Sequence, residues 1–235
     1  MIQVCLNGTR SARDGAAVPL SPAALAESAA AAVAAGAAEI HVHPKTLCGS
    51  DSLSPGVVGP ALEAIRAAVR VPVGVTTGAW AEPDPARRVA HVRSWTVLPE
   101  YASVNWHEDG AEEVATALLD RGVGVEAGVW SGTDGARRFL RSRSAPKVLR
   151  VLAEVTGTTE GAAESAARAL LAELGTAHDG PVLLHGEDDG AWPVLRLARR
   201  LGLDTRIGLE DVLLLPDGRR ARCNAQLVTA ALACS

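Results

Sequence analysis

The chain has 235 residues, of which 48% are hydrophobic, so it can bury a sizeable core and is not a disordered chain. Its net charge of −4 comes from 23 basic and 27 acidic residues of interspersed sign, which excludes the basic surface of a nucleic-acid-binding protein or of a membrane-surface helix. No apolar run reaches the roughly 18 to 20 residues of a membrane span, and the four cysteines are widely spaced, so we expect a cytoplasmic protein with reduced thiols.

Strand-like and helix-like segments alternate along the chain. In chain order, the predicted strands, each with the helix that follows it, are Ile2–Leu6 and Pro22–Ala35, Glu39–His43 and Pro60–Val69, Val71–Thr77 and Pro85–Arg93, Ala102–Trp106 and Ala111–Asp120, Val123–Glu126 and Thr133–Arg141, Lys147–Val155 and Thr159–Leu174, Val182–His185 and Ala191–Leu201, and Thr205–Leu209 and Asn224–Ala233. Eight such units predict a single-domain (β/α)8 TIM barrel over residues 1–235. A doubly wound open sheet fits less well, because no Gly-rich turn follows the first strand.

Two histidines at the end of the second predicted strand are the first candidates for chemistry. In a (β/α)8 barrel the active site lies at the C-terminal ends of the strands. His41 and His43 are separated by one residue, so the alternation of a strand places both side chains on the same face. Two imidazoles in this arrangement suit one divalent metal ion, although such pairs also occur as packed or surface histidines.

Charged residues end the last predicted strand. Arg206, Gly208 and Glu210 share one face by the same alternation, and Glu210 reaches the mouth of the barrel. We expect Gly208 to leave room for a ligand. An acid in this place can instead cap a following helix, but the Val212–Pro216 run has no strong helix-start pattern.

Polar side chains also end the other predicted strands. They are Thr76, Thr77, Ser103, Asn105, His107, Glu126, His185 and Glu187, and the acids and hydroxyls among them are candidates for substrate contacts. Three tryptophans follow strand ends or open helices, so they either line the mouth or pack in the interior, and packing is favoured; they are Trp80, Trp130 and Trp192. Surface positions are expected for two further histidines, His91 and His178.

Four segments of the sequence resemble one enzyme family. They are Val18–Pro22, Ala35–Pro44, Arg206–Asp211 and Asn224–Val228, and they occur in the family's order along the chain. By these motifs the chain is identified as a member of the β-keto acid cleavage enzyme family. The resemblance implies a (β/α)8 fold, usually as a homotetramer. It also implies a reversible Claisen-type reaction in which a β-keto acid and acetyl-CoA give acetoacetate and a new acyl-CoA.

The resemblance implies roles for individual residues as well. The implied cofactor is Zn²⁺, held by His41, His43 and Glu210. Arg206 and Asp211 match an Arg and an Asp that act together in proton transfer, with Asp211 as the general base. Glu126 matches the catalytic strand-five Glu, and Thr76 or Thr77 matches a substrate-binding hydroxyl. The remaining candidates for substrate binding are Ser103, Asn105 and Arg10.

The sequence departs from the family pattern in several places. The chain is shorter than usual, and Asp204-Thr205 precedes the strand-eight arginine where the family usually has His-Val. Pro44-Lys45 and residues 105–108 also differ from the common forms. These segments lie next to the expected substrate site, so the particular keto acid and the use of acetyl-CoA stay open.

Three alternatives compete with this interpretation. A metal-dependent hydrolase of the amidohydrolase type also has a His-x-His strand, but it requires a carbamylated lysine on strand four, where this chain has none. A Schiff-base aldolase has only Lys45 and Lys147 available, and Lys147 lies at the wrong end of its strand. A non-catalytic ligand-binding barrel is the third alternative. Two histidines and one carboxylate can also hold Fe(II), and zinc is preferred from the resemblance alone.

Overall fold

The computed structural model describes residues 1–15, 17–175 and 180–234, so the predicted surface residue His178 lies outside the described part. Strands and helices alternate in the order β1 (Ile2–Cys5), α1 (Pro22–Ala34), β2 (Glu39–Val42), α2 (Pro55–Ala68), β3 (Val73–Thr76), α3 (Pro85–Ser94), β4 (Tyr101–Asn105), α4 (Ala111–Leu119), β5 (Gly124–Trp130), α5 (Gly135–Leu140), β6 (Arg150–Val155), α6 (Glu160–Leu174), β7 (Val182–Gly186), α7 (Ala191–Arg200), β8 (Thr205–Ile207) and α8 (Asn224–Ala233). Short 3₁₀ turns lie at Ala145–Lys147 and Asp188–Gly190.

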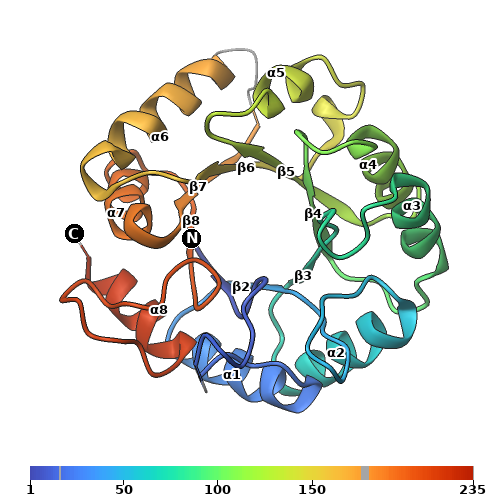
Figure 1. Cartoon of the computed structure of the whole chain (residues 1–235), viewed down its shortest axis with the longest axis horizontal. Helices are drawn as coiled ribbons and strands as arrows, with labels where there is room; N and C mark the ends of the chain where they lie inside the picture. Colours follow the sequence, from blue (N-terminus) through green and yellow to red (C-terminus); the bar gives the residue numbers. More distant parts are fainter. Residues whose placement is uncertain (16, 176–179, 235) are drawn as a thin grey trace.

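The eight strands form one parallel sheet that curls into a barrel. Each strand pairs with its neighbours in sequence, and β1 pairs with β8. β7 and β8 meet through a bridge between Leu183 and Asp204, and the hydroxyl of Thr205 donates to the carbonyl oxygen of Leu184 at 2.7 Å. Figure 1 shows the strands around the centre and the helices as an outer ring. The prediction of a TIM barrel is confirmed.

The outward faces of the strands and the inner faces of the helices form the core. Aliphatic side chains such as Val4, Ile40, Val75 and Val125 alternate along the strands with inward-facing polar ones. Many of the helix residues that meet them are alanines, which lets helices and strands approach closely. The polar residues of the strands are therefore left to fill the interior of the barrel and its mouth.

Three boundaries differ from the predicted ones by three residues or more. α2 begins at Pro55, because a proline is favoured in the first turn, and Pro60 lies inside the helix. β5 continues to Trp130 instead of ending at Glu126, so Glu126 lies in the lower half of the barrel. β6 begins only at Arg150, because residues 145–147 form a 3₁₀ turn.

Gly208 does not leave room for a ligand, contrary to our prediction. A Cβ atom at this position would overlap the backbone oxygen of Cys5. The glycine therefore allows the chain after β8 to approach β1 closely, which brings the following residues back over the barrel. Among the helices of the described ranges, none combines the length and the apolarity needed to cross a lipid bilayer.

Candidate functional site

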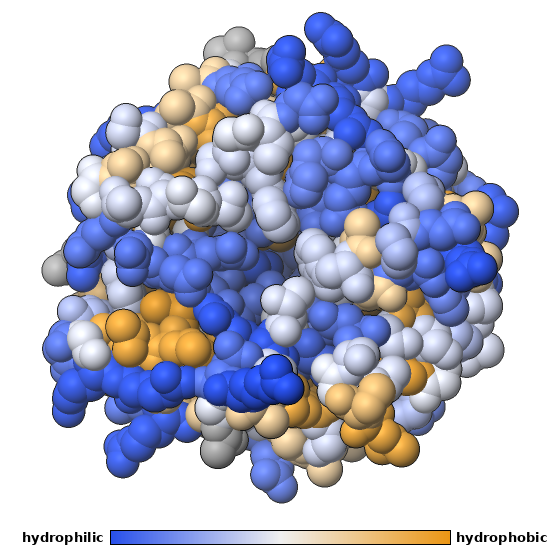
Figure 2. Space-filling model, in the orientation of Figure 1, coloured by the Kyte–Doolittle hydropathy of each residue, from blue (hydrophilic) through white to orange (hydrophobic). Residues whose placement is uncertain are grey.

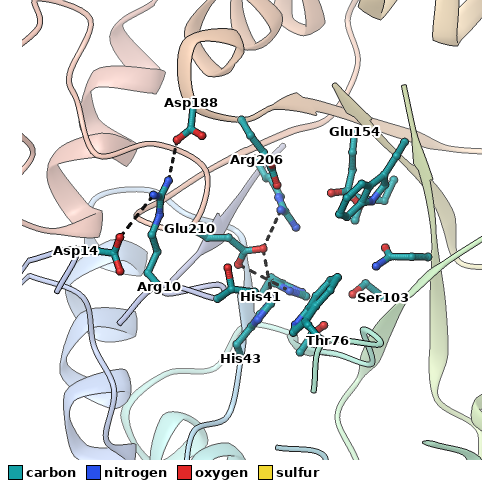
Figure 3. A pocket seen from close by; sticks show the side chains of 16 residues that line it. Arg10, Asp14, His41, His43, Thr76, Ser103, Glu154, Asp188, Arg206 and Glu210 are labelled. Carbon is teal, nitrogen blue, oxygen red and sulfur yellow. Dashed lines mark hydrogen bonds and ion pairs between the residues drawn. The ribbon is translucent and has the colours of Figure 1, made fainter. Parts of the chain in front are cut away.

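A pocket of about 310 Å³ opens at the C-terminal ends of the strands. Figure 2 shows it as a hollow with hydrophilic walls at the centre of the molecule. Its lining consists of Thr9, Arg10, Asp14, His41, His43, Thr76, Trp80, Ser103, Asn105, Trp130, Leu152, Glu154, Glu187, Asp188, Arg206 and Glu210. In Figure 3, Arg206, Glu210 and His41 meet at its centre, with Arg10 on one side and Ser103 and Glu154 on the other.

Two histidines and one carboxylate converge at the floor of the pocket. His41 lies in β2, His43 follows it directly, and Glu210 follows β8. One ligand atom from each lies within 4.8 Å of the other two. Nε2 of His41 is 3.9 Å from Oε2 of Glu210, and Nε2 of His43 is 3.5 Å from Oε1.

The donor atoms of this triad fit a divalent metal ion. Oε2 of Glu210 is buried and has no hydrogen-bond partner among the described residues, although buried polar atoms are normally paired. Two imidazoles and a carboxylate are a common donor set of catalytic metal sites, which keep a further position open for substrate. The side chain of Asn7 fixes the backbone of the second histidine, because it accepts from the His43 N–H and donates to the His43 carbonyl oxygen, both at 2.9 Å.

The charges around the triad give its three members different protonation states when no metal is bound. Burial lowers the pKa of His41 to about 3, so this imidazole is neutral at pH 7. Burial acts on His43 in the same direction, but Glu210 and Asp51 outweigh it and raise the pKa of His43 to about 9. Despite its burial, Glu210 has a pKa well below its usual range because of the Arg206 guanidinium. Metal binding at this site would therefore release a proton from His43.

Arg206 connects the triad to a second carboxylate, Asp211. Its Nη2 donates to Oε1 of Glu210 and to Oδ1 of Asp211, both at 2.9 Å. Asp211 is fully buried, and it does not line the pocket. Despite that burial, Arg206 and His185 lower the pKa of Asp211. The thiol of Cys5, whose own pKa is raised by burial, donates to the second oxygen of Asp211 at 2.9 Å.

Two further carboxylates lie on the β6 and β7 side of the pocket. His185 is buried between Glu154 and Asp211, with Nε2 3.5 Å from Oε2 of Glu154 and Nδ1 3.5 Å from Oδ2 of Asp211. Burial opposes a charge on this imidazole, but Asp211 and Glu154 raise the pKa of His185 to about 9. Burial and the neighbouring Glu154 raise the pKa of Glu187 to about 7. Near neutral pH this wall therefore holds a protonated imidazole between two carboxylates, and Glu187 is only partly ionised.

Hydrogen bonds fix the orientation of the Asn105 side-chain amide. Its Nδ2 donates to Oε1 of Glu108 at 2.9 Å, and Glu108 is held by Arg88 at 2.5 Å. Because an ionised carboxylate only accepts, Oδ1 of Asn105 is the atom that faces away from Glu108. A Cβ at Gly128 would lie 2.5 Å from this Oδ1 and 3.2 Å from Oε1 of Glu154. Two hydrogen-bond acceptors thus lie close together on this side of the pocket.

The structure brings most of the predicted site residues together. The triad, Arg206, Arg10, Thr76, Ser103 and Asn105 all line the pocket. Thr77 does not, because its hydroxyl donates to the Ser103 carbonyl oxygen at 2.7 Å. Arg10 lies between Asp188, at 2.8 Å, and Asp14, at 3.9 Å.

Glu126 is separate from the pocket lining. It is fully buried inside the lower barrel, where Arg150 Nε donates to its Oε1 at 2.7 Å and Gln3 donates to the same oxygen at 2.9 Å. Burial raises the pKa of Glu126, although Arg150 opposes the shift. The alternation of β5 places Glu126 on the inner face of the barrel. It precedes Gly128 by two residues and Trp130 by four, so it lies farther from the C-terminal end of the strand, where the pocket opens.

Sequence reasoning missed five pocket residues, which are Thr9, Asp14, Leu152, Glu154 and Asp188. Glu154 shares the inner face of β6 with Leu152, and because the end of this strand at Val155 was predicted correctly, strand alternation could have found it. Asp14 belongs to a loop without a motif. Trp80 and Trp130, for which packing was expected, line the pocket, and Trp80 stacks on the ring of His43 at 5.7 Å. The two tryptophan rings stack on each other at 6.3 Å, so they form an aromatic wall beside the triad.

Comparison with known proteins gives a family for the whole chain. The sequence profile of the family described as BKACE, beta-keto acid cleavage enzyme, matches residues 1–235. A comparison with curated protein sequences gave no match.

Solved structures support the same fold. The chain is similar to ObcA in a ternary complex with a C4-CoA adduct and oxalate, at 16% identity and a TM-score of 0.68, over 92% of this chain and 63% of the ObcA chain. It is also similar to type I 3-dehydroquinate dehydratase from Clostridium difficile with covalently modified comenic acid, at 12% identity and a TM-score of 0.67, over 99% of this chain and 89% of that one. The chain thus spans less than two thirds of the ObcA length, and at these identities the likeness concerns the fold.

Proposed function

The chain belongs to the beta-keto acid cleavage enzyme family, and on this premise we propose that it is an acyltransferase that cleaves a β-keto acid with acetyl-CoA as co-substrate. The products are acetoacetate and a new acyl-CoA. The proposed cofactor is zinc, held by His41, His43 and Glu210. We further propose that residues 1–235 form one domain of a cytoplasmic homotetramer, as the family resemblance implies.

The observation that carries this proposal is the convergence of the triad and a guanidinium in one pocket. Arg206 lines the pocket and donates to Glu210 at 2.9 Å. A β-keto acid presents a ketone and a carboxylate that are close together in one molecule, and both oxygen groups require positive partners. A zinc ion bound by the triad would supply a Lewis acid for the negative charge that develops on the keto oxygen as the carbon–carbon bond breaks.

The remaining pocket residues bind and orient the substrate in this proposal. The hydroxyl groups of Thr76 and Ser103 lie on the inner faces of β3 and β4, where they can donate to substrate oxygens. Arg10 supplies a second positive charge at the rim, although Asp188 partly neutralises it. Trp80 and Trp130 limit the access of water to the triad from the adjoining side.

Asp211 is the proposed proton acceptor, and Arg206 keeps it ionised. Because Asp211 is sealed beneath the pocket, it can take a proton from the substrate only when its pair with Arg206 loosens. A substrate carboxylate competes for the same guanidinium, so substrate binding favours this change. Glu126 does not touch the substrate in this scheme, because Arg150 holds it in the lower barrel, outside the pocket lining.

Metal analysis and product analysis test the proposal. We expect about one zinc per chain in the purified protein, and its loss in a His41→Ala, His43→Ala double variant, whereas full metal retention contradicts the ligand assignment. A panel of β-keto acids with acetyl-CoA should yield acetoacetate. Hydrolysis of the panel without CoA would instead support an amidohydrolase-type activity.

Asp211→Asn tests the proton acceptor separately from the metal. It keeps the shape of the side chain and should keep the zinc, but we expect turnover to fall about 10²- to 10⁴-fold. The matched control is Asp120→Asn, the same change at an exposed position after α4. An Asp211→Asn variant with the activity of this control would refute the assignment.

A further inference from the structure

A second cavity, of about 440 Å³, lies beside the catalytic pocket. It runs between α7 and the segment after β8, and we call it the α7 groove. Its floor is apolar and consists of Trp192, Pro193 and residues 212–216. Asp188 lines both the groove and the pocket, so the two share a wall. Figure 2 shows a hydrophobic patch next to the central hollow, on the side of α7 and α8.

The floor of the groove is held in place by hydrogen bonds. Residues 213–221 form a small antiparallel turn, in which Leu215 N–H donates to Arg219 at 2.8 Å and Ala221 N–H donates to Leu213 at 2.9 Å. The indole Nε1 of Trp192 donates to the carbonyl oxygen of Leu214 at 2.9 Å. The Leu214 side chain is left 47% exposed above this turn. The apolar surface is therefore preformed and open to solvent.

Two arginines on the groove have no anionic partner. Arg196 and Arg220 line it, and neither forms an ion pair or a side-chain hydrogen bond with a described residue. The neighbouring Arg219 differs, because it pairs with Asp217 at 2.7 Å. The groove also contains the acids Glu160, Asp188 and Asp189, of which Asp188 is paired with Arg10. Glu160 and Asp189 likewise have no cationic partner among the described residues, so the two guanidinium groups are available both to these acids and to an external anion.

The position of these arginines agrees with a general property of the fold. In TIM barrels, phosphate groups frequently bind at the loops after strands 7 and 8. Arg196 lies in α7, which follows β7, and Arg220 lies in the segment after β8. Arginine is well suited to phosphate because its planar guanidinium donates two parallel hydrogen bonds.

We propose that the α7 groove binds the CoA part of the acyl-CoA co-substrate. The pantetheine arm lies on the apolar floor, the thioester end passes Asp188 into the catalytic pocket, and Arg196 and Arg220 bind phosphates of the nucleotide. The identity of the thioester rests on the proposed function. The groove itself is assigned from its shared wall, its apolar floor and its two unpaired arginines.

Direct binding tests the groove without turnover. The affinities of purified wild-type protein for CoA and for pantetheine, which lacks the nucleotide phosphates, are measured by calorimetry. In Arg196→Gln and in Arg220→Gln we expect CoA to bind about tenfold more weakly, because a charge-assisted hydrogen bond is lost. The affinity for pantetheine should not change. Arg219→Gln, with the same charge change on the same turn, is the matched control and should bind CoA like the wild type.

Three results would overturn the proposal. The first is an unchanged affinity for CoA in both arginine variants. The second is an equal loss in the Arg219→Gln control, because the effect would then follow net charge alone. The third is a wild-type protein that does not bind CoA. Leu214→Ser, which alters only the exposed floor, should weaken CoA and pantetheine alike, and an unchanged affinity for both would exclude the floor from the site.

Kinetics separates this proposal from the proposed reaction. If the wild type converts β-keto acids with acetyl-CoA and the two arginine variants keep its KM for acetyl-CoA, the groove assignment is wrong and the reaction stands. If CoA binds as predicted but no β-keto acid is cleaved, the groove assignment stands and the reaction is wrong. The expected pattern is a KM for acetyl-CoA raised about tenfold, with the KM for acetyl-pantetheine unchanged.

Discussion

The substitution Arg150→Met tests whether Glu126 belongs to the structural interior of the barrel. The Arg150 guanidinium contacts two carboxylates, Glu126 at 2.7 Å from its Nε and Glu39 at its Nη2. Gln3 also donates to Glu126, but it carries no charge. A methionine has a similar length, so the substitution removes the charge and leaves Glu126 buried without a cation.

The expected loss of stability follows from that burial. Removing one partner of a buried ion pair typically costs about 3 to 5 kcal/mol. We expect about 3 kcal/mol at pH 8, because Gln3 still hydrogen-bonds the carboxylate. Burial already raises the pKa of Glu126, and loss of Arg150 raises it further. A group whose pKa is higher in the folded state destabilises the fold as pH rises through that range, so the deficit should shrink from pH 8 to pH 5.

Urea unfolding at pH 8 and pH 5 measures both effects. The informative comparison is the double variant Arg150→Met, Glu126→Gln, which has no buried unpaired charge and should be more stable than Arg150→Met alone at pH 8. Zinc content should be the same in all three proteins. A single variant within about 1 kcal/mol of the wild type at pH 8, or a double variant less stable than the single one, would refute the reasoning.

Three further substitutions probe the mouth of the barrel. Burial and Glu154 raise the pKa of Glu187 to about 7, so ionisation of Glu187 destabilises the fold as pH rises from about 4.5 through 7. In metal-free protein, urea unfolding should therefore show Glu187→Gln to be about 2 kcal/mol more stable than the wild type at pH 8. At pH 4 the variant should be no more stable than the wild type. Gly208→Ala should lower both the unfolding temperature and the zinc content, because the new methyl group overlaps the backbone of Cys5. The control Gly161→Ala should change neither, because a Cβ there has no neighbour within 4 Å. Equal behaviour of the two variants would contradict this reasoning. Trp80→Ala should raise the KM for the β-keto acid several-fold at unchanged zinc content, and zinc loss would instead show that stacking on His43 supports the ligand.

The alternation of strand-like and helix-like segments predicted the fold, and side-chain parity along β2 placed His41 and His43 on one side of the barrel. The same parity grouped Arg206 with Glu210, but β8 ends at Ile207, so Glu210 reaches the site from the turn after the strand. The barrel then brings the ends of β2 and β8 together through β1, which lies between them. The sequence and the fold class together therefore predicted a three-residue cluster that the structure contains.

The height of a residue inside the barrel was less predictable than its face. Glu126 and Glu154 both point inward, but one lies near the start of β5 and the other near the end of β6. That difference depends on where each strand starts and ends. The prediction placed Glu126 at the end of its strand, whereas β5 continues for four more residues, to Trp130. It also depends on partners from distant strands, such as Arg150 for Glu126, which no local pattern shows.

One side of the pocket consists of residues from the family motifs, and the opposite side consists of residues outside them. The side of His41, Glu210 and Arg206 is built from motif residues and is suited to the oxygen atoms that every β-keto acid carries. The opposite side is built from Asn105, with its Oδ1 turned away from Glu108, and from Glu154, neither of which belongs to those motifs. Glu154 already pairs with His185, but Oδ1 of Asn105 accepts no hydrogen bond from a described residue, so it favours a substrate side chain that itself donates a hydrogen bond. If the proposed reaction is correct, we therefore expect the choice among keto acids to depend on residues outside the motifs that carry the family resemblance.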